Sequence, residues 1–243
     1  SVDEVGRVTV AAAGPVDRGK GVFYPPNLPF DEVQIVKPLQ RFSRDVTVIN
    51  DANAGVLGEY CYGDADAENL VYLTISSGIG AGVVMDGDLI EGWKGNVGEV
   101  GHTQIVENGV ECGCGGTGHW EAYCSGEKIP DFVEHVTGRE YSDAREVFRD
   151  YESGDDDLEE VFERLREYNA RGIANIVNLY NPSAVRVGGG VALNHPDVVF
   201  GDLEEKVRKE SVNAVPDIEP ASLREEAVIH GLKAVANGHG PEL

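Results

Sequence analysis

The sequence predicts an α/β fold, and three observations lead to this interpretation. Short apolar, β-branched runs alternate with segments of helical periodicity along the 243 residues. Several predicted strands end in Gly-rich or Asp-containing turns, which is where α/β folds place their functional sites. No internal repeat and no linker long enough to separate independent domains interrupts the alternation.

The first half of the chain predicts a strand-rich segment with two helices. The predicted strands are residues 7–13, 46–49, 70–75, 83–85 and 89–90, and the predicted helices are 37–43 and 52–62. Gly14–Asp17 predicts a tight turn, and Asp86-Gly87 is the strongest short hairpin signal in the chain. Residues 24–29 form a Pro-rich loop.

The second half of the chain is mainly helical. Helices are predicted at 128–136, 144–151, 202–212 and 223–237. A longer helix should follow the acidic residues 155–157, which suit a positive helix N-terminus, and should stop before Pro182. A strand over residues 184–187 separates this long helix from the last two and runs directly into three glycines.

The charge balance excludes two classes of partner. Acidic residues outnumber basic ones by 43 to 20, which gives a formal net charge of −23. This charge repels nucleic acid and anionic lipid, so neither is an expected partner. The acidic residues are dispersed and Lys is scarce, which favours a halophilic source over an ordinary acidic protein. Without a 20-residue apolar run or a signal-peptide pattern, a cytoplasmic location is predicted.

Residues 96–126 carry the strongest single signal, a compact group of metal-ligand side chains. The candidates are two imidazoles and two thiols: His102, Cys112, Cys114 and His119. Four such ligands close a tetrahedral zinc site and leave no open position, so a structural Zn²⁺ is predicted. Cys124 is an alternative ligand, and a surface loop with incidental thiols is the alternative to a metal site. Glu99 and Glu121 flank the candidate ligands.

Three strand-to-turn junctions could carry further chemistry. Asp51 follows a predicted strand and could accept a proton, although an Asp at this place alone is more often a helix cap. Ser76–Gly82 is a Gly-rich turn whose N–H groups could approach a phosphate, or it could be purely structural. Gly188–Gly190 could let a planar ligand approach the backbone, or could be a simple turn. Neither glycine stretch ends as a Walker A loop does.

Taken together, these motifs resemble one family. The matching segments occur in order over nearly the whole chain: GPVD at 14–17, PNLP at 26–29, NDANA at 50–54, SGIGAG at 77–82, GEVGH at 98–102, CGCG at 112–115, GHWE at 118–121 and GGGV at 188–191. The combination resembles the ROK sugar kinases, which include many bacterial and archaeal glucokinases. The resemblance implies a two-lobed actin-like (ribonuclease H-like) α/β fold.

The resemblance also implies a role for each matching position. Asp51 would be the catalytic base that takes the proton from the primary hydroxyl of the sugar. The sugar site would be lined by Asn27, Asn50, Glu99, His102 and Glu121. ATP, with Mg²⁺, would contact Ser77, Gly78, Gly80, Gly188, Gly189 and Gly190. The zinc ligands would be His102, Cys112, Cys114 and His119, with His119 standing where the family usually has Cys.

The resemblance further predicts the domain organisation. Residues 1–50, with the last helix at 223–243 packed back on them, would form the remainder of a small lobe, and residues 51–222 a large lobe with a zinc loop at 102–124. The family's D-x-G-x-T phosphate-binding segment does not occur in the sequence, so an incomplete N-terminal lobe is expected. A truncated, inactive kinase is therefore one alternative.

A sugar-binding ROK transcriptional regulator is the other alternative to a kinase. Such regulators carry a helix-turn-helix and tend to lose the catalytic Asp, whereas Asp51 is present here. The expected partners are a small-molecule sugar and a nucleotide, with assembly into a homo-oligomer, either a dimer or a tetramer. Glucose is the favoured sugar, while mannose, fructose, N-acetylglucosamine and N-acetylmannosamine are taken by relatives of the family.

Overall fold

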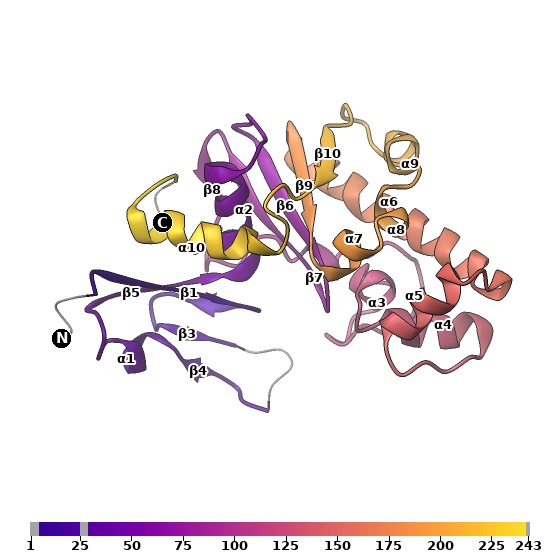
Figure 1. The fold of residues 1–243 in the computed structure, drawn as a ribbon, viewed down its shortest axis with the longest axis horizontal. Helices are drawn as coiled ribbons and strands as arrows, with labels where there is room; N and C mark the ends of the chain where they lie inside the picture. The colour runs from indigo at the N-terminus through magenta and orange to yellow at the C-terminus, as the bar shows by residue number, and fades with distance from the viewer. Residues whose placement is uncertain (1–4, 25–28, 242–243) are drawn as a thin grey trace. The chain divides into compact units, whose positions relative to one another are not determined.

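Three sheets are formed by the described residues, 5–24 and 29–241, of the computed structural model (Figure 1). The chain divides into two compact units, residues 1–72, 81–98 and 221–243 in the first and residues 73–80 and 99–220 in the second. The division falls within strands β6 (Leu70–Ile75) and β7 (Ile79–Met85), so each of these strands contributes residues to both units.

The first unit contains two small sheets. Strand β1 pairs in parallel with β5, so that Ala12 lies opposite Asn50 at their carboxyl ends. Strands β2, β3 and β4 form an antiparallel sheet in that order. The elements of this unit are β1 (Arg7–Ala12), β2 (Val16–Asp17), β3 (Val22–Phe23), β4 (Val33–Gln34), α1 (Val36–Leu39), β5 (Asp45–Asn50), α2 (Asp51–Tyr62), β8 (Asp88–Leu89), the 3₁₀ turn η4 (Arg224–Glu226) and α10 (Ala227–Asn237).

Helices α2 and α10 pack closely because glycines lie at their contact. A Cβ on Gly58 would lie 2.0 Å from the carbonyl oxygen of Ala227, and one on Gly231 would lie 1.7 Å from that of Ala54. Gly58, which weakens the intrinsic helix propensity of α2, is thus required for the packing of α2 against α10. Both helices of this contact belong to the first unit.

The second unit is built around part of a five-stranded sheet of order β10-β9-β6-β7-β8. Its elements are η2 (Val100–His102), α3 (Glu121–Cys124), α4 (Ile129–Thr137), α5 (Ala144–Glu152), η3 (Asp156–Leu158), α6 (Glu159–Tyr180), β9 (Ala184–Gly188), α7 (Gly190–Asn194), α8 (Asp197–Phe200), α9 (Leu203–Glu210) and β10 (Asp217–Pro220). The predicted long helix is α6, which ends at Asn181 in the left-handed region (φ 47°), immediately before Pro182.

Some sequence predictions were wrong in their extent. The helix expected over 37–43 is only Val36–Leu39, and the helix expected over 223–237 begins as a 3₁₀ turn. The expected turn at 14–17 includes strand β2. Strand β10 was not predicted, because its charged residues and Pro220 give no apolar alternation; as the outermost strand of its sheet, it tolerates a residue without an N–H group.

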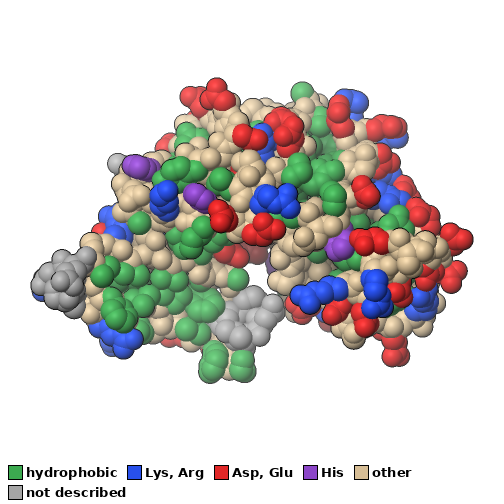
Figure 2. All heavy atoms as spheres, in the orientation of Figure 1, with side chains coloured by type: hydrophobic (Ala, Val, Ile, Leu, Met, Phe, Trp, Pro, Cys, Tyr) green, Lys and Arg blue, Asp and Glu red, His purple; other side chains and the backbone are tan. Residues whose placement is uncertain are grey.

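Acidic side chains are scattered over the face shown in Figure 2, with Lys and Arg between them, rather than gathered in one patch. This distribution matches the dispersed charge seen along the sequence. Within residues 5–24 and 29–241, no helix combines the length and apolar character needed to cross a membrane.

Candidate functional site

The β5–α2 junction places two predicted site residues at the end of a parallel strand pair. Asn50, the last residue of β5, caps helix α2: its Oδ1 accepts hydrogen bonds from the backbone N–H groups of Ala52 (2.9 Å) and Asn53 (3.2 Å). Its Nδ2 donates to the carbonyl oxygen of Gly14 (3.3 Å), two residues beyond the end of β1. One amide side chain therefore fixes the helix start relative to the neighbouring strand.

Asp51 is the first residue of α2 and is half-buried. Burial raises the pKa of its carboxyl group, and this effect outweighs the hydrogen bond that Oδ1 accepts from the N–H of Ala52 (3.0 Å). A carboxylate with a raised pKa is a stronger proton acceptor than an exposed one. The environment of Asp51 therefore suits a general base.

The four predicted metal ligands lie together in the second unit. One donor atom from each of His102, Cys112, Cys114 and His119 can be chosen so that all four atoms lie within 4.8 Å of one another. Nδ1 of His102 lies 3.7 Å from Sγ of Cys112, and Nδ1 of His119 lies 3.2 Å from Sγ of Cys114. A tetrahedral zinc ion with ordinary bond lengths separates its ligand atoms by about 3.3–3.8 Å, so these two pairs lie close to the tetrahedral spacing, and the whole group, within 4.8 Å, is compact enough to close around one ion.

Backbone turns hold this loop around the four side chains. The N–H of Gly115 donates to the carbonyl oxygen of Cys112 (2.8 Å), with Gly115 in the left-handed region (φ 87°). Gly118 also has positive φ (70°), and a Cβ there would lie 1.8 Å from the carbonyl oxygen of Val106. Gly115 and Gly118 are thus required by the turns that bring the ligands together.

Cys124 is not part of this group. Its thiol is fully buried and donates to the carbonyl oxygen of Leu165 (3.7 Å), and burial strongly raises its pKa. A thiol in such surroundings is held in its neutral form, whereas a metal ligand must be a thiolate. The geometry therefore favours His119 over Cys124 as the fourth ligand.

His102 connects the cysteines to two predicted sugar contacts. Its Nε2 lies 3.9 Å from a carboxylate oxygen of Glu99 and 4.0 Å from Oε1 of Glu121, while its Nδ1 faces Cys112. The other carboxylate oxygen of Glu121, Oε2, accepts from the N–H of Ile79 (2.8 Å). Of the two ring nitrogens of His102, Nδ1 thus faces the thiol of Cys112, and Nε2 faces the carboxylates of Glu99 and Glu121.

The two predicted nucleotide-binding glycine stretches meet in the second unit. Gly189 adopts φ 89°, and a Cβ there would lie 2.4 Å from the carbonyl oxygen of Ile75, the last residue of β6. Ser76 and Gly78 follow that strand, and a Cβ on Gly78 would lie 2.9 Å from Oε2 of Glu121. Sequence reasoning missed this second role of Glu121, which holds the Gly-rich turn through Ile79, because nothing in the spacing relates the two.

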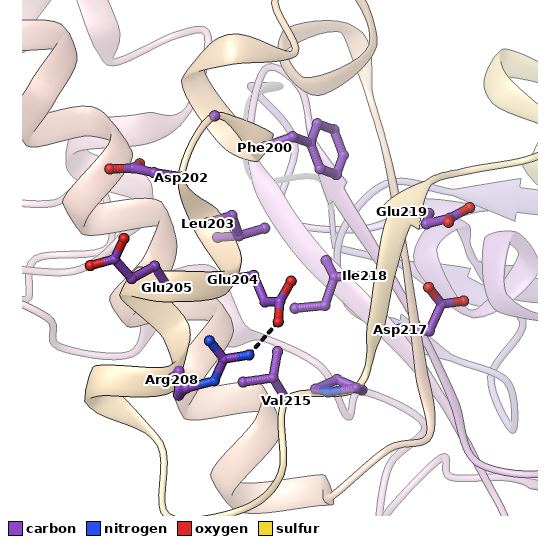
Figure 3. Close-up of a pocket in the computed structure, with 12 residues that line it drawn as sticks. Phe200, Asp202, Leu203, Glu204, Glu205, Arg208, Val215, Asp217, Ile218 and Glu219 are labelled. Atoms are coloured by element: carbon purple, nitrogen blue, oxygen red, sulfur yellow. Dashed lines mark hydrogen bonds and ion pairs between the residues drawn. The ribbon is translucent and has the colours of Figure 1, made fainter.

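The other residues predicted to contact the nucleotide lie in strands, in a helix and in a turn. Gly80 lies in β7, Gly188 ends β9, Gly190 begins α7 and Ser77 is exposed in the turn between β6 and β7. Asn27 lies outside the described residues. A cavity of about 790 Å³ between α9 and β10 contains none of the predicted residues (Figure 3). Carboxylates line this cavity, and Arg208 pairs with Glu204 of its own helix.

Comparison with known proteins identifies the family of the chain. The model of the ROK family matches residues 1–239. A glucokinase from Pyrobaculum calidifontis is 36% identical over 231 residues, which cover 94% of this chain and 78% of the relative. A xylose repressor from Bacillus subtilis is 27% identical over 96% of this chain and 61% of its own length. The homologues thus include both kinases and repressors.

Two solved structures also resemble this chain over most of its length. A ROK hexokinase from Thermus thermophilus superimposes with a TM-score of 0.80 at 34% identity, covering 91% of this chain and 75% of that protein. A ROK glucokinase from Streptomyces griseus in complex with glucose and AMPPNP gives a TM-score of 0.79 at 26% identity, covering 96% and 82%. These neighbours confirm the predicted actin-like α/β fold class. The chain belongs to the ROK family and is a sugar kinase of that family.

Proposed function

We propose that this chain transfers the γ-phosphoryl group of ATP to the primary hydroxyl of a hexose, with glucose as the preferred sugar. The observation that carries the proposal is Asp51, a half-buried carboxylate of raised pKa at the carboxyl end of a parallel strand. The glucokinase relative and the neighbour in complex with glucose and AMPPNP support the choice of glucose and of ATP.

The proposed reaction needs one proton acceptor and well-placed substrates. The carboxylate of Asp51 accepts the hydroxyl proton as the sugar oxygen forms a bond to the γ-phosphorus. The bond between that phosphorus and the β,γ-bridging oxygen breaks, and ADP leaves with the electron pair. Mg²⁺ bound to the nucleotide supplies the charge neutralisation that phosphoryl transfer requires. The protein's main contribution is therefore positioning, to which the cap at Asn50 contributes.

The polar side chains predicted from the sequence are proposed to hold the sugar hydroxyls. Glu99 and Glu121 are acceptors, His102 can donate or accept, and Asn50 offers an amide. Carboxylates hold a neutral polyol in one orientation without adding positive charge. The glycine turn at Ser77–Gly78 and the Gly188–Gly190 loop are proposed to receive the nucleotide, because both follow the ends of strands of the five-stranded sheet and carry backbone N–H groups on glycine.

We also propose that His102, Cys112, Cys114 and His119 hold a structural Zn²⁺. The donor set and its size fit the ion. By fixing the ring of His102, the ion would orient the nitrogen that faces Glu99 and Glu121. Zinc bound to the purified protein, measured by elemental analysis, should be stoichiometric and should be lost in Cys112→Ser, together with thermal stability. A metal-free protein of unchanged melting temperature would exclude this role.

A coupled assay that follows ADP release tests the function directly. The panel should include glucose, mannose, fructose, N-acetylglucosamine and N-acetylmannosamine, each with ATP, at low and at high KCl because of the net charge of −23. Glucose is expected to give the highest kcat/KM. Sugar binding by calorimetry without turnover on any member of the panel would contradict the proposal and favour a sugar-binding regulator, the class to which the repressor relative belongs.

A further inference from the structure

A second cavity, of about 520 Å³, lies within the first unit. The turn between β2 and β3 forms one wall, and residues 91–96, which follow β8, form the other. Among the described residues, none of those proposed above to contact the hexose, the nucleotide or the metal lines this cavity. The volume falls within the range of roughly 300–1,000 Å³ that is typical of small-molecule sites.

The two walls of this pocket are tied together by side chains. Asn96 Oδ1 accepts from the N–H of Val16 (2.8 Å), and its Nδ2 donates to the carbonyl oxygen of Val16 (3.4 Å). At the turn, Arg18 forms an ion pair with Glu91 of the opposite wall. These links fix the loop against the hairpin before any ligand arrives, which lowers the entropic cost of binding.

Trp93 lies at this pocket and is unusually exposed. The side chain is 92% exposed, whereas the other tryptophan of the chain, Trp120, is completely buried. The Nζ of Lys94 lies 4.5 Å from the centroid of the Trp93 ring, so one face of the indole has a cation over it. An exposed indole offers a large apolar area together with an N–H donor, and here it stands at the edge of a pocket rather than alone on a flat surface.

Two of the three cations that line the pocket are paired with its two carboxylates, and the third, Lys94, lies over the ring of Trp93. Arg18 is paired with Glu91, and Lys20 lies 3.6 Å from Asp17 and 3.4 Å from the hydroxyl of Tyr24. A ligand therefore need not bring a charge of its own. The pocket offers an aromatic face together with hydroxyl, carboxylate and guanidinium edges. This combination fits the C–H faces and the hydroxyl groups of a neutral sugar ring.

We propose that this pocket is a second saccharide site, which binds one neutral hexose unit against Trp93. The unit could be a free hexose or the end of a longer oligosaccharide, and the experiment below separates these sources. The proposal goes beyond the kinase activity and does not depend on it, because binding at Trp93 requires neither ATP nor Asp51.

The fluorescence of Trp93 tests the proposal. Because Trp120 is buried, acrylamide quenching of the full chain reports mainly on Trp93. Titration with glucose, maltose and maltotriose should shift the emission to the blue and protect it from acrylamide. A response to glucose identifies a free-hexose site, and a response only to the oligomers identifies an end-unit site. Inorganic phosphate and glucose 6-phosphate should give no response.

Variants decide whether the response comes from this pocket. Trp93→Phe should abolish the fluorescence response, and Tyr24→Phe should weaken binding by up to about tenfold through the loss of one hydrogen bond. Phe42→Ala, at an exposed position of the first unit outside the pocket, should change nothing. Glu121→Gln should weaken the hexose affinity of the proposed active site and leave the Trp93 response intact.

Three outcomes would overturn the proposal. The first is the absence of any response to the neutral saccharides, and the second is a response only to the phosphate-bearing ligands, which would identify an anion site. The third is a Trp93 response that weakens in parallel with the active site in Glu121→Gln, since the signal would then report hexose binding at the active site. A failure of the kinase assay alone would leave the pocket proposal standing.

Discussion

Two strand-to-helix junctions of this chain use opposite means to build a site. At the β5–α2 junction, in the first unit, the strand ends in polar side chains, and Asn50 caps the helix that begins with Asp51. At the β9–α7 junction, in the second unit, the strand ends in Gly188–Gly190, and no side chain projects at all. One junction presents chemical groups, and the other presents bare backbone.

The difference follows from what each proposed substrate needs. A sugar hydroxyl must lose a proton and be held in one orientation, and both tasks require side chains. A nucleotide needs room for close approach to N–H groups, which any Cβ would obstruct. Substitutions should therefore affect turnover most at the first junction and folding or nucleotide affinity most at the second.

The largest expected effect is that of Asp51→Asn on turnover. The amide keeps the size of the carboxyl group and cannot accept the proton, so kcat should fall by about a hundred- to ten-thousandfold. The affinity for glucose, measured by calorimetry, should remain within a few-fold of the parent value. Near-normal turnover in this variant would show that Asp51 is not the base.

Substitutions at the β9–α7 junction should instead lower the stability of the fold. Gly189→Ala places a Cβ 2.4 Å from the carbonyl oxygen of Ile75 at a φ of 89°, so we expect a loss of about 3 kcal/mol in the free energy of unfolding. Gly190→Ala is the matched control, because its Cβ would meet nothing closer than 3.8 Å. Urea denaturation compares the two variants. Equal stabilities would contradict the claim that the positive φ of Gly189 and its close approach to Ile75 require glycine.

These junctions also show how far the sequence could predict the structure. Local patterns predicted α2, α6 and the end of β9 closely, because apolar periodicity, Pro182 and the glycines are local signals. The clustering of His102, Cys112, Cys114 and His119 could be predicted for the same reason, since they lie within one short segment, and the structure brings their side chains together.

Long-range contacts could not be predicted in this way. The link between Glu121 and the N–H of Ile79 spans 42 residues, and the close approach of Gly189 to Ile75 depends on the strand order. Neither of these two contacts produces a periodicity or a motif in the sequence around its residues. The short strands β2, β3 and β4 were missed because two residues carry no periodicity.

A smaller effect is expected for the cap at the first junction. Asn50→Ala removes the acceptor for two backbone N–H groups and should cost about 1 kcal/mol of stability. Asn50→Asp keeps that acceptor but loses the Nδ2 donor to the carbonyl oxygen of Gly14, so it should recover only part of the lost stability, while the added carboxylate beside Asp51 should raise the pKa of the base further. Thermal melts and the pH dependence of kcat measure the two effects separately. An equal loss of stability in both variants would contradict the cap.

The smallest effect concerns the stability cost of keeping Asp51 ready to accept a proton. Burial raises the pKa of its carboxyl group in the folded state above the value of about 3.9 in the unfolded chain. The ionised form is thus disfavoured in the fold, and this cost is complete above the folded pKa and vanishes as the pH falls below the unfolded pKa. Asp51→Asn should therefore melt higher than the parent near pH 7, and the difference should shrink as the pH is lowered. A difference in melting temperature that stays constant between pH 7 and the acid range would mean that the substitution acts on packing or capping and not on the charge.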